Sequence, residues 1–488
     1  MNKLLNKSKI FGIIAWFILE GCTSQTEQNY DLIIKNGRMI DPETGRDEVI
    51  DVAVKGGTIV AIEADLNLES AKVIDATGLI VSPGFIDILS SDRPNKHAHT
   101  HKITDGVTTT MGMHGGSVDP IEYARQFEAS GALINYGRAV GHRNLRRAVG
   151  LNDGTIPANE EQIKAMQELA DKAIKSGSAG IGFGINYSPG ASYEEVFALF
   201  EVAAANNVPC HLHARYKGNV FPGTMSLAVM EVVAAAAATG AQAQLAHLTS
   251  STVGSAPLCI KLIEGAFRNS VDVGFDFHVW SRNMTSLQSA LYNKGWEERF
   301  GGITYDSIYV ASTQEQLTKE RFFELRNVEG STLVQTEFIP ENEIIMAIKS
   351  PLAIISSDGA GLFSEGGHEK ETGHPRSTGT FARFLRKFVR EQQVISLPEA
   401  IKKITLLPAK RLEKSVPAMK RKGRIQVGAD ADITIFDFEN ITENADYQYP
   451  YRYSSGVKYV MVNGVIVLED EEIIMDVSPG TWMNHSIK

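Results

Sequence analysis

Residues 194–214 read EEVFALFEVAAANNVPCHLHA, a helix-like stretch followed at once by a short apolar strand. Apolar residues in the first part recur with the spacing of an amphipathic helix. The second part, VPCHLHA, has the length and apolarity of a buried strand. A helix that leads directly into such a strand is typical of a fold built from parallel βα units.

The same alternation extends from Pro83 to about Leu407, and SLAVMEVVAAAAATG at 226–240 is a second helix of this kind. Eight runs are predicted as strands, and eight βα units fit a TIM barrel. These runs are 79–89, 106–113, 132–140, 179–185, 208–214, 242–248, 270–278 and 352–359. Residues 284–345 exceed what one crossover needs and contain strands of their own, so we predict an insertion over the barrel mouth.

The two ends of the chain have the alternation of β-structure instead. DLIIKNGRMID and DVAVKGGTIVAIEA follow Tyr30, and GRIQVGADADITIFD and VKYVMVNGVIVLED close the chain. These distant pieces are predicted to pair into one small β-sandwich. The predicted class is therefore α/β, with sandwich parts at 30–82 and 416–480 and the barrel at 83–415.

Composition and charge narrow the function. The chain has 488 residues, 43% of them hydrophobic, which is enough for one large domain and a satellite. Its formal net charge is -10 and it has no basic run, whereas binding to phosphates needs clustered Lys and Arg. Nucleic acid is therefore not expected as a partner, and a small-molecule substrate is.

The first 22 residues are predicted to be a lipoprotein-type signal peptide. Three lysines precede the apolar run 10–19, and Gly21 and Cys22 follow it, in the order of a bacterial lipobox. Cys22 would be lipidated and would anchor an exported protein to a membrane of the cell envelope, either periplasmic or associated with the outer membrane. The alternative is a plain signal peptide or an uncleaved anchor.

Four polar residues stand where predicted barrel strands end. His114, His213 and His247 follow the second, fifth and sixth strands, and Asp358 follows the eighth. Active sites of TIM barrels lie at this end of the strands. Three imidazoles can hold Zn²⁺ with an open position for water, and a nearby carboxylate can take the proton of that water. For any single histidine, the alternative is an imidazole with a purely structural role.

The chain resembles the D-aminoacylase branch of the amidohydrolase superfamily over nearly its whole mature length. The motifs that carry the resemblance are DLIIKNGRMIDPETG, SPGFID, DGVTT, GINYSPGAS, HLHAR, AHL, SSDG, HPRSTGTFARFL and GRIQVGADADITIFD. The resemblance implies a barrel with a split β-sandwich. It also implies hydrolysis of the amide bond of an N-acyl-D-amino acid by a metal-activated water.

Within this resemblance, His213 and His247 match the metal-binding histidines and Asp358 matches the catalytic aspartate. His114 stands at the bridging position, which is usually Cys or Glu. The Asp-x-His-x-His motif after strand one reads Asp87-Ile88-Leu89-Ser90-Ser91, so both of its histidines are missing. We therefore expect one zinc ion per chain, held by His114, His213 and His247.

A second group of histidines follows strand one. His97, His99 and His101 belong to the sequence KHAHTH, and they are a possible source of replacement ligands. The reading that we favour places them on a surface helix, because they lie beyond the end of the strand.

Substrate contacts are predicted from the same resemblance. Arg376 matches the arginine expected to hold the substrate carboxylate, a task that suits a guanidinium. Tyr187 and Arg215 are further candidates for contacts with the substrate. The amino-acid side chain that the enzyme prefers in its substrate stays open. Tyr136, His142 and the run 143–147 are candidates to shape the pocket, although a solvated basic face explains that run better.

Two classes of function therefore remain. The first is a metal-dependent amidohydrolase that acts on N-acyl-D-amino acids or similar small amides, with Asp358 as general base and acid. The alternative is a catalytically inactive lipoprotein that keeps the barrel as a binding scaffold, which the missing histidines suggest. A hydrolase of another bond, such as a cyclic amide, is a third reading that the GINYSPG and HPRSTGTF motifs disfavour.

Overall fold

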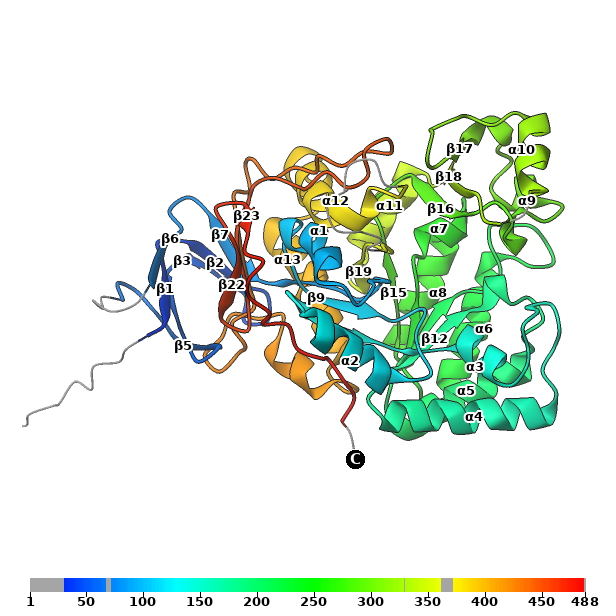
Figure 1. Ribbon diagram of the computed structural model, residues 1–488, viewed down its shortest axis with the longest axis horizontal. Helices are drawn as coiled ribbons and strands as arrows, with labels where there is room; N and C mark the ends of the chain where they lie inside the picture. Colours follow the sequence, from blue (N-terminus) through cyan, green and yellow to red (C-terminus); the bar gives the residue numbers. More distant parts are fainter. Residues whose placement is uncertain (1–29, 67–71, 329, 361–371, 487–488) are drawn as a thin grey trace, which may run out of the picture.

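The computed structural model describes residues 30–66, 72–328, 330–360 and 372–486. A β-sandwich forms one end of the molecule, and a larger part with helices around parallel strands forms the other (Figure 1). The predicted signal peptide and its Cys22 lie outside the described residues. Within those described ranges, none of the helices has the length and apolar character needed to cross a membrane.

The sandwich joins the two ends of the described chain. Its sheets have the strand orders β5-β4-β1-β6 and β23-β22-β21-β20-β7-β2-β3. β7 pairs antiparallel with β20, with Val81 opposite Ile435. The strands are β1 (Leu32–Lys35), β2 (Arg38–Asp41), β3 (Arg46–Val49), β4 (Asp51–Lys55), β5 (Thr58–Glu63), β6 (Lys72–Asp75), β7 (Ile80–Pro83), β20 (Ile433–Phe436), β21 (Val457–Val462), β22 (Val465–Glu469) and β23 (Glu472–Ile473).

The barrel wall consists of parallel strands in two ladders, β10-β9-β8 and β11-β12-β13-β14-β15-β19. Ala139 links β10 to β11, and its N–H donates to the carbonyl of Gly112. A parallel bridge between Ser90 and Gly359 connects the two outer edges. The strands are β8 (Phe85–Asp87), β9 (Val107–Gly112), β10 (Asn135–Arg138), β11 (Val140–Gly141), β12 (Ile181–Gly184), β13 (Cys210–His213), β14 (Ala243–Leu245), β15 (Val273–Phe277) and β19 (Ala353–Ile355).

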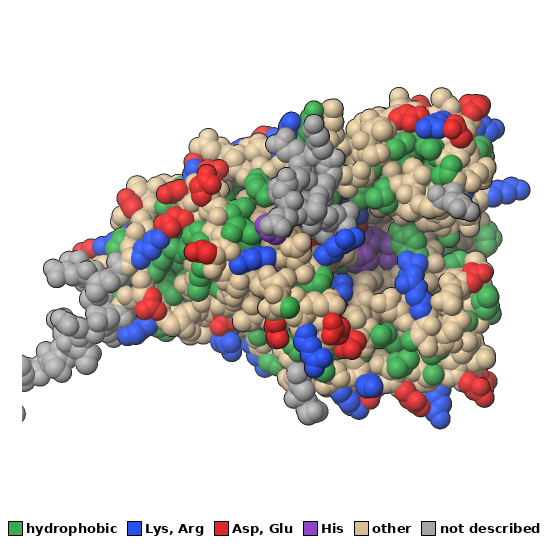
Figure 2. Space-filling view, in the orientation of Figure 1, with side chains coloured by type: hydrophobic (Ala, Val, Ile, Leu, Met, Phe, Trp, Pro, Cys, Tyr) green, Lys and Arg blue, Asp and Glu red, His purple; other side chains and the backbone are tan. Residues whose placement is uncertain are grey.

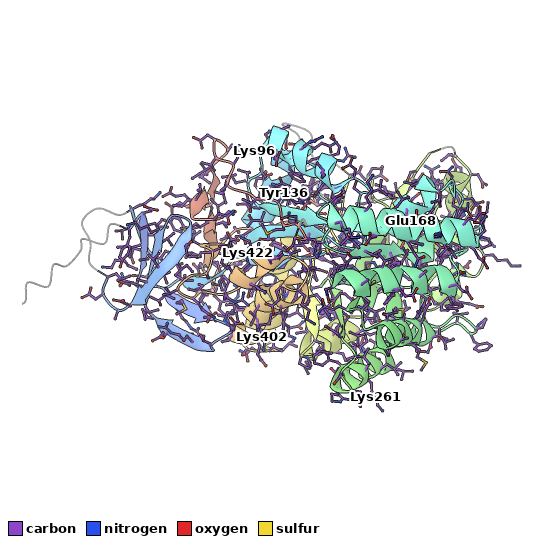
Figure 3. The ribbon with its side chains drawn as sticks, turned by 90° about the horizontal axis from the view of Figure 1, so that it is seen from below. Lys96, Tyr136, Glu168, Lys261, Lys402 and Lys422 are labelled. Carbon is purple, nitrogen blue, oxygen red and sulfur yellow. The ribbon has the colours of Figure 1, made fainter. Side chains whose placement is uncertain are left out.

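Every run predicted as a barrel strand contains one of these strands. The run 79–89 divides at Gly84, with β7 in the sandwich and β8 in the barrel. Lys422, at the sandwich end of the barrel in Figure 3, is buried and lies 2.7 Å from the carboxylate of Asp432. The predicted fold class, a TIM barrel with a β-sandwich made from both ends of the chain, is confirmed.

Helices cover the outside of the barrel. In α5 (Tyr193–Asn206), the buried residues Val196, Leu199, Phe200 and Ala203 have the i, i+3, i+4, i+7 spacing that points one face toward the strands. Ser192 caps this helix by accepting the N–H of Glu195. Figure 3 shows Lys261 on the outer side of α8. Other covering helices are α2 (Pro120–Ser130), α3 (His142–Ala148), α4 (Glu160–Lys175), α6 (Met225–Thr239), α8 (Ala256–Arg268), α11 (Glu341–Lys349), α13 (Leu397–Ile404) and α14 (Leu406–Leu412).

A small antiparallel sheet, β16-β18-β17, lies between β15 and β19 in the chain. It reaches the barrel mouth, because the carbonyl of Arg282 lies 3.1 Å from Nε2 of His374 and Tyr187 Oη lies 3.4 Å from Thr285 Oγ1. The strands of this sheet are β16 (Arg282–Ser286), β17 (Ile308–Val310) and β18 (Leu333–Glu337), and the helices α9 (Trp296–Arg299) and α10 (Lys319–Arg326) lie between them in the chain.

The surface helix predicted for the second histidine group is wrong. His99 and His101 are completely buried, with an exposed fraction of 0%, and only His97 is partly exposed. The short helix that follows, α1 (Thr100–Thr104), packs between β9 and α12 (Arg376–Arg383). The ring of His99 stacks on Phe127 at a centroid distance of 5.1 Å. His99 and His101 are therefore part of the buried packing.

Tyr136 has no place in the pocket either. Its ring stacks on Phe127 at 4.1 Å and belongs to a buried aromatic cluster with Tyr123 and Trp482. Figure 3 shows Tyr136 toward the sandwich side of the barrel. Its side chain is therefore a core residue.

Candidate metal and active site

The strand-end residues meet at one end of the barrel. His213 is the last residue of β13, and His114, His247 and Asp358 follow β9, β14 and β19 within three residues. Parallel strands in a barrel end on the same face, so residues far apart in the sequence converge there. Figure 2 shows histidine side chains in a hollow with Lys and Arg side chains on its rim.

The three predicted histidine ligands differ in their spacing. The rings of His213 and His247 lie 4.3 Å apart, and those of His114 and His247 lie 5.9 Å apart. Nε2 of His114 lies 3.6 Å from the Asp358 carboxylate. Burial lowers the pKa of His247 to about 4 and also lowers the pKa values of His114 and His213. All three imidazoles are therefore neutral near pH 7, the form that binds metals.

The donor set fits a zinc ion in its chemistry. Nδ1 of His114 and Nδ1 of His247 are buried and have no hydrogen-bond partner among the described residues. A buried ring nitrogen normally has a partner, so these two atoms are free to bind a ligand. The described ranges contain no ready-made group of three His, Cys, Asp or Glu ligands, so the complete ligand set stays a prediction.

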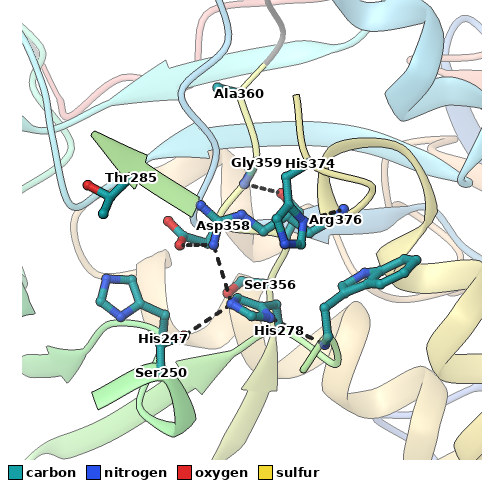
Figure 4. Close-up of polar contacts among 12 residues, drawn as sticks. His247, Ser250, His278, Thr285, Ser356, Asp358, Gly359, Ala360, His374 and Arg376 are labelled. Carbon is teal, nitrogen blue, oxygen red and sulfur yellow. Dashed lines mark hydrogen bonds and ion pairs between the residues drawn. The ribbon is translucent and has the colours of Figure 1, made fainter. Parts of the chain in front are cut away.

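Asp358 is ionised and paired with the predicted substrate-binding arginine. Nη1 of Arg376 lies 2.9 Å from Oδ2 of Asp358. Figure 4 marks this ion pair with a dashed line. Burial opposes ionisation of this carboxyl, but opposing influences led by the charge of Arg376 outweigh it, so the pKa of Asp358 lies below its usual value. A carboxylate beside the histidines can accept a proton from water.

A further network holds Arg376. Its Nη1 lies 3.4 Å from Nε2 of His278, which in turn lies 3.1 Å from Oγ of Ser250 (Figure 4). The backbone N–H of Arg376 donates to Nδ1 of His374 at 3.0 Å. Contacts from Asp358 and His278 thus hold the guanidinium, and His374 holds the backbone of the same residue.

Asp276 was missed by the sequence analysis. Its Oδ1 accepts the N–H of His247 at 3.0 Å and the hydroxyl of Ser356 at 2.9 Å. His247 has φ = 35° and Asp358 has φ = 49°, backbone angles that residues other than Gly rarely adopt. Asp276 therefore stabilises the strained turn that carries one candidate ligand. An acidic residue within the apolar run SVDVGFDFH was the available signal.

A buried ion pair involves Asp87, the first residue of the segment that lacks the histidine pair. Nζ of Lys102 lies 2.7 Å from Oδ2 of Asp87 and 2.8 Å from Oγ of Ser357. Burial opposes the charge of Lys102, but Asp87 and Asp92 outweigh it, so the pKa of Lys102 is raised. Leu89 is completely buried in the wall. An ammonium group thus neutralises Asp87.

Two predicted substrate contacts have different outcomes. The ring of Tyr187 lies 4.9 Å from that of His213, so Tyr187 is at the site. The guanidinium of Arg215 instead forms hydrogen bonds of 2.8–3.2 Å with both carboxylate oxygens of Glu231. The structure therefore does not bring Arg215 together with the strand-end residues.

A cavity of about 200 Å³ opens beside His114 and Tyr187. It continues toward α3, whose Arg143, Asn144 and Arg147 line it together with His142 and the glycines at 115, 116, 141, 182 and 184. A larger hollow of about 840 Å³ lies between α5 and α6 on the outer surface and contains none of the strand-end residues. We assign the smaller cavity to the site because one predicted metal ligand, His114, and the neighbouring Tyr187 line it.

Comparisons with known proteins show that the chain is similar to amidohydrolases over most of its length. A family model described as "Amidohydrolase family" matches residues 371–468. An N-acyl-D-glutamate deacylase of Alcaligenes xylosoxydans xylosoxydans is 28% identical, over 90% of this chain and 94% of the relative.

Two solved structures are similar over almost the whole chain. One is a D-aminoacylase, described with one-metal activation and second-metal attenuation of a binuclear centre, at 25% identity and a TM-score of 0.79, covering 94% of this chain and 100% of that one. The other is the N-acyl-D-glutamate deacylase from Bordetella bronchiseptica with zinc and a phosphonate inhibitor, at 25% identity and a TM-score of 0.78, covering 93% and 100%. The predicted resemblance to the D-aminoacylase branch of the amidohydrolase superfamily is confirmed.

Proposed function

We propose that this chain hydrolyses the amide bond of N-acyl-D-amino acids or similar small amides. The observation that supports the proposal most strongly is the Asp358–Arg376 pair at 2.9 Å, beside two buried neutral histidines. The pair combines a proton acceptor with a group that recognises carboxylates. The relatives named above act on substrates that carry both an amide and a carboxylate.

One zinc ion is the proposed cofactor, with His114, His213 and His247 as its ligands. Zinc supplies Lewis acidity, which activates water and polarises an amide carbonyl. The neutral state of the three imidazoles suits this role. The Lys102–Asp87 pair favours one ion over two, because Leu89 and Ser91 replace the expected ligands of a first metal.

The proton transfers are assigned to Asp358. Its carboxylate accepts a proton from the attacking water, and the same proton then passes to the nitrogen of the breaking C–N bond. The products are a carboxylate and a free D-amino acid. Because Arg376 now pairs with Asp358, the substrate carboxylate must compete for this guanidinium when it binds. Tyr187 is proposed to line the substrate pocket beside His213.

The proposal is tested with enantiomer pairs of N-acetyl amino acids, assayed after zinc is supplied. Turnover of the D-forms with little turnover of the L-forms is the expected result. Absence of turnover for every amide in a folded, zinc-loaded sample would overturn the proposal and favour the alternative, a binding scaffold without activity.

We also propose that the chain is an exported lipoprotein anchored through Cys22. The proposal rests on the order of lysines, apolar run and Gly21-Cys22 in the sequence. Incorporation of labelled fatty acid that disappears in a Cys22→Ser variant is the expected result. Incorporation of the labelled fatty acid into the Cys22→Ser variant would contradict the proposed anchor.

A further inference from the structure

The cavity beside His114 has a cationic wall. Arg143 and Arg147, one turn apart on α3, both line it together with Tyr187. The guanidinium of Arg143 lies 5.8 Å from the ring of Tyr187. The two arginines are therefore neighbours of the candidate active site and not only of solvent. Arg143 and Arg147 are also exposed, as a solvated basic face predicts, whereas Arg146 between them is buried.

These two guanidinium groups lack an anionic partner within the described part of the chain. Arg146, between them, is buried against Glu195 at 2.6 Å, and Arg376 is paired with Asp358. The guanidinium groups of Arg143 and Arg147 form no hydrogen bond or ion pair with a described residue. Like charges at i and i+4 on a helix repel each other by a few tenths of a kcal/mol. An anion between them would remove that repulsion.

Glycines keep this space open. A Cβ built on Gly184 would point into it, 3.5 Å from Cδ of Arg143 and 3.7 Å from Cδ2 of Tyr187. Gly184 has φ = -119°, which any residue can adopt. Asn144 closes another side, with its amide donating to the carbonyl of Gly116 at 2.7 Å. The cavity is therefore lined by the backbone of several glycines and by the side chains of Arg143 and Arg147.

We propose that Arg143 and Arg147 form a subsite for a second carboxylate on the substrate, beyond the one that Arg376 receives. This inference rests on the proposed amide hydrolysis and specifies its substrate class. A guanidinium fork matches a carboxylate in shape and charge. The second carboxylate comes from an acidic side chain of the D-amino acid or from a dicarboxylic acyl group, because either one can extend from the reacting amide toward α3.

The test compares matched acidic and neutral substrates. Wild-type protein is expected to hydrolyse N-acetyl-D-glutamate with a kcat/KM about tenfold to hundredfold above that for N-acetyl-D-glutamine, its neutral isostere. The Arg143→Gln/Arg147→Gln variant should lose this preference and keep its kcat/KM for the neutral substrate. Arg125→Gln, which changes an exposed arginine of α2 outside the cavity, serves as the matched control and should keep the preference.

Two further experiments identify which part of the substrate carries the second carboxylate and test whether the substrate occupies the cavity. A preference for N-succinyl-D-leucine over N-acetyl-D-leucine, with none for D-glutamate, would assign the subsite to the acyl group. Gly184→Ala, whose methyl group enters the cavity, should reduce turnover of the preferred acidic substrate more than that of its neutral counterpart. An equal loss on both would contradict the placement.

Failure of this inference is distinguishable from failure of the proposed function. Equal turnover of acidic and neutral substrates by the wild type, or equal losses in the double variant, would overturn the second-carboxylate subsite while amide hydrolysis stands. If no amide is hydrolysed, the proposed function fails. Calorimetry with N-acetyl-D-glutamate and N-acetyl-D-glutamine then decides the inference, because tighter binding of the acid that depends on Arg143 and Arg147 supports it and equal binding overturns it.

Discussion

The guanidinium of Arg376 lies 2.9 Å from the carboxylate of Asp358, within a site where both side chains are mostly buried. The pair couples two tasks, because Asp358 must accept a proton and Arg376 must receive the substrate. A charge pair shielded from water is strong, and its partners are costly to separate. Substrate binding therefore has to replace one carboxylate by another at Arg376.

Loss of the arginine should affect binding. In Arg376→Gln, we expect KM for N-acyl-D-amino acids to rise about tenfold to hundredfold, because a charge-assisted hydrogen bond to the substrate is lost. Steady-state kinetics measure the change. The corresponding N-acetyl amine, which lacks the carboxylate, is the control substrate. Equal losses on both would show that Arg376 does not recognise the carboxylate.

Loss of the carboxylate should affect the chemical step. Asp358→Asn removes the proton acceptor and is expected to lower kcat about 10²-fold to 10⁴-fold. Zinc content should not change, because the proposed ligands are histidines. Turnover at the wild-type rate in a folded, zinc-loaded sample of this variant would rule out Asp358 as the general base.

Asp276 should control the metal site indirectly. Asp276→Ala leaves the N–H of His247 without its acceptor, and we expect zinc affinity to fall about tenfold to hundredfold. Asp276→Asn retains an oxygen acceptor and is the matched control, for which a much smaller change is expected. Competition with a metal-binding dye measures both affinities. Unchanged affinity in Asp276→Ala would contradict the positioning role.

The Lys102–Asp87 pair should matter for stability. Lys102→Met leaves a buried carboxylate without its partner, so the free energy of unfolding should decrease by about 3–5 kcal/mol in denaturant titration. Lys175 forms an ion pair of the same kind with Asp171, but those side chains are 59% and 38% exposed. Lys175→Met should therefore change stability by less than about 1 kcal/mol. Similar effects of both substitutions would contradict the structural role of the buried pair.

The barrel could be predicted from the sequence because its strands are short apolar runs with helices between them. Parallel strands end on one face, which is why His213, His247 and Asp358 could be grouped before any distance was known. Motif similarity then provided the candidate role for Arg376. These features depend on local pattern and on topology alone.

Contacts that depend on packing could not be predicted in this way. Asp87 and Lys102 meet because α1 folds back on the barrel, and the same packing buries His99. In the run 143–147, only the structure separates Arg146, which pairs with Glu195, from Arg143, which lines the cavity. Sequence spacing does not show which face of so short a helix is buried.

Zinc content and amide turnover, measured on the same samples of protein without residues 1–22, test the central claim most directly. Metal-stripped protein is titrated with zinc, and the His247→Ala variant is treated in parallel. We predict that turnover of an N-acyl-D-amino acid appears as about one zinc per chain is bound, and that the variant loses both. Turnover that persists without metal, or a chain that binds no zinc, would contradict the proposed one-metal amidohydrolase.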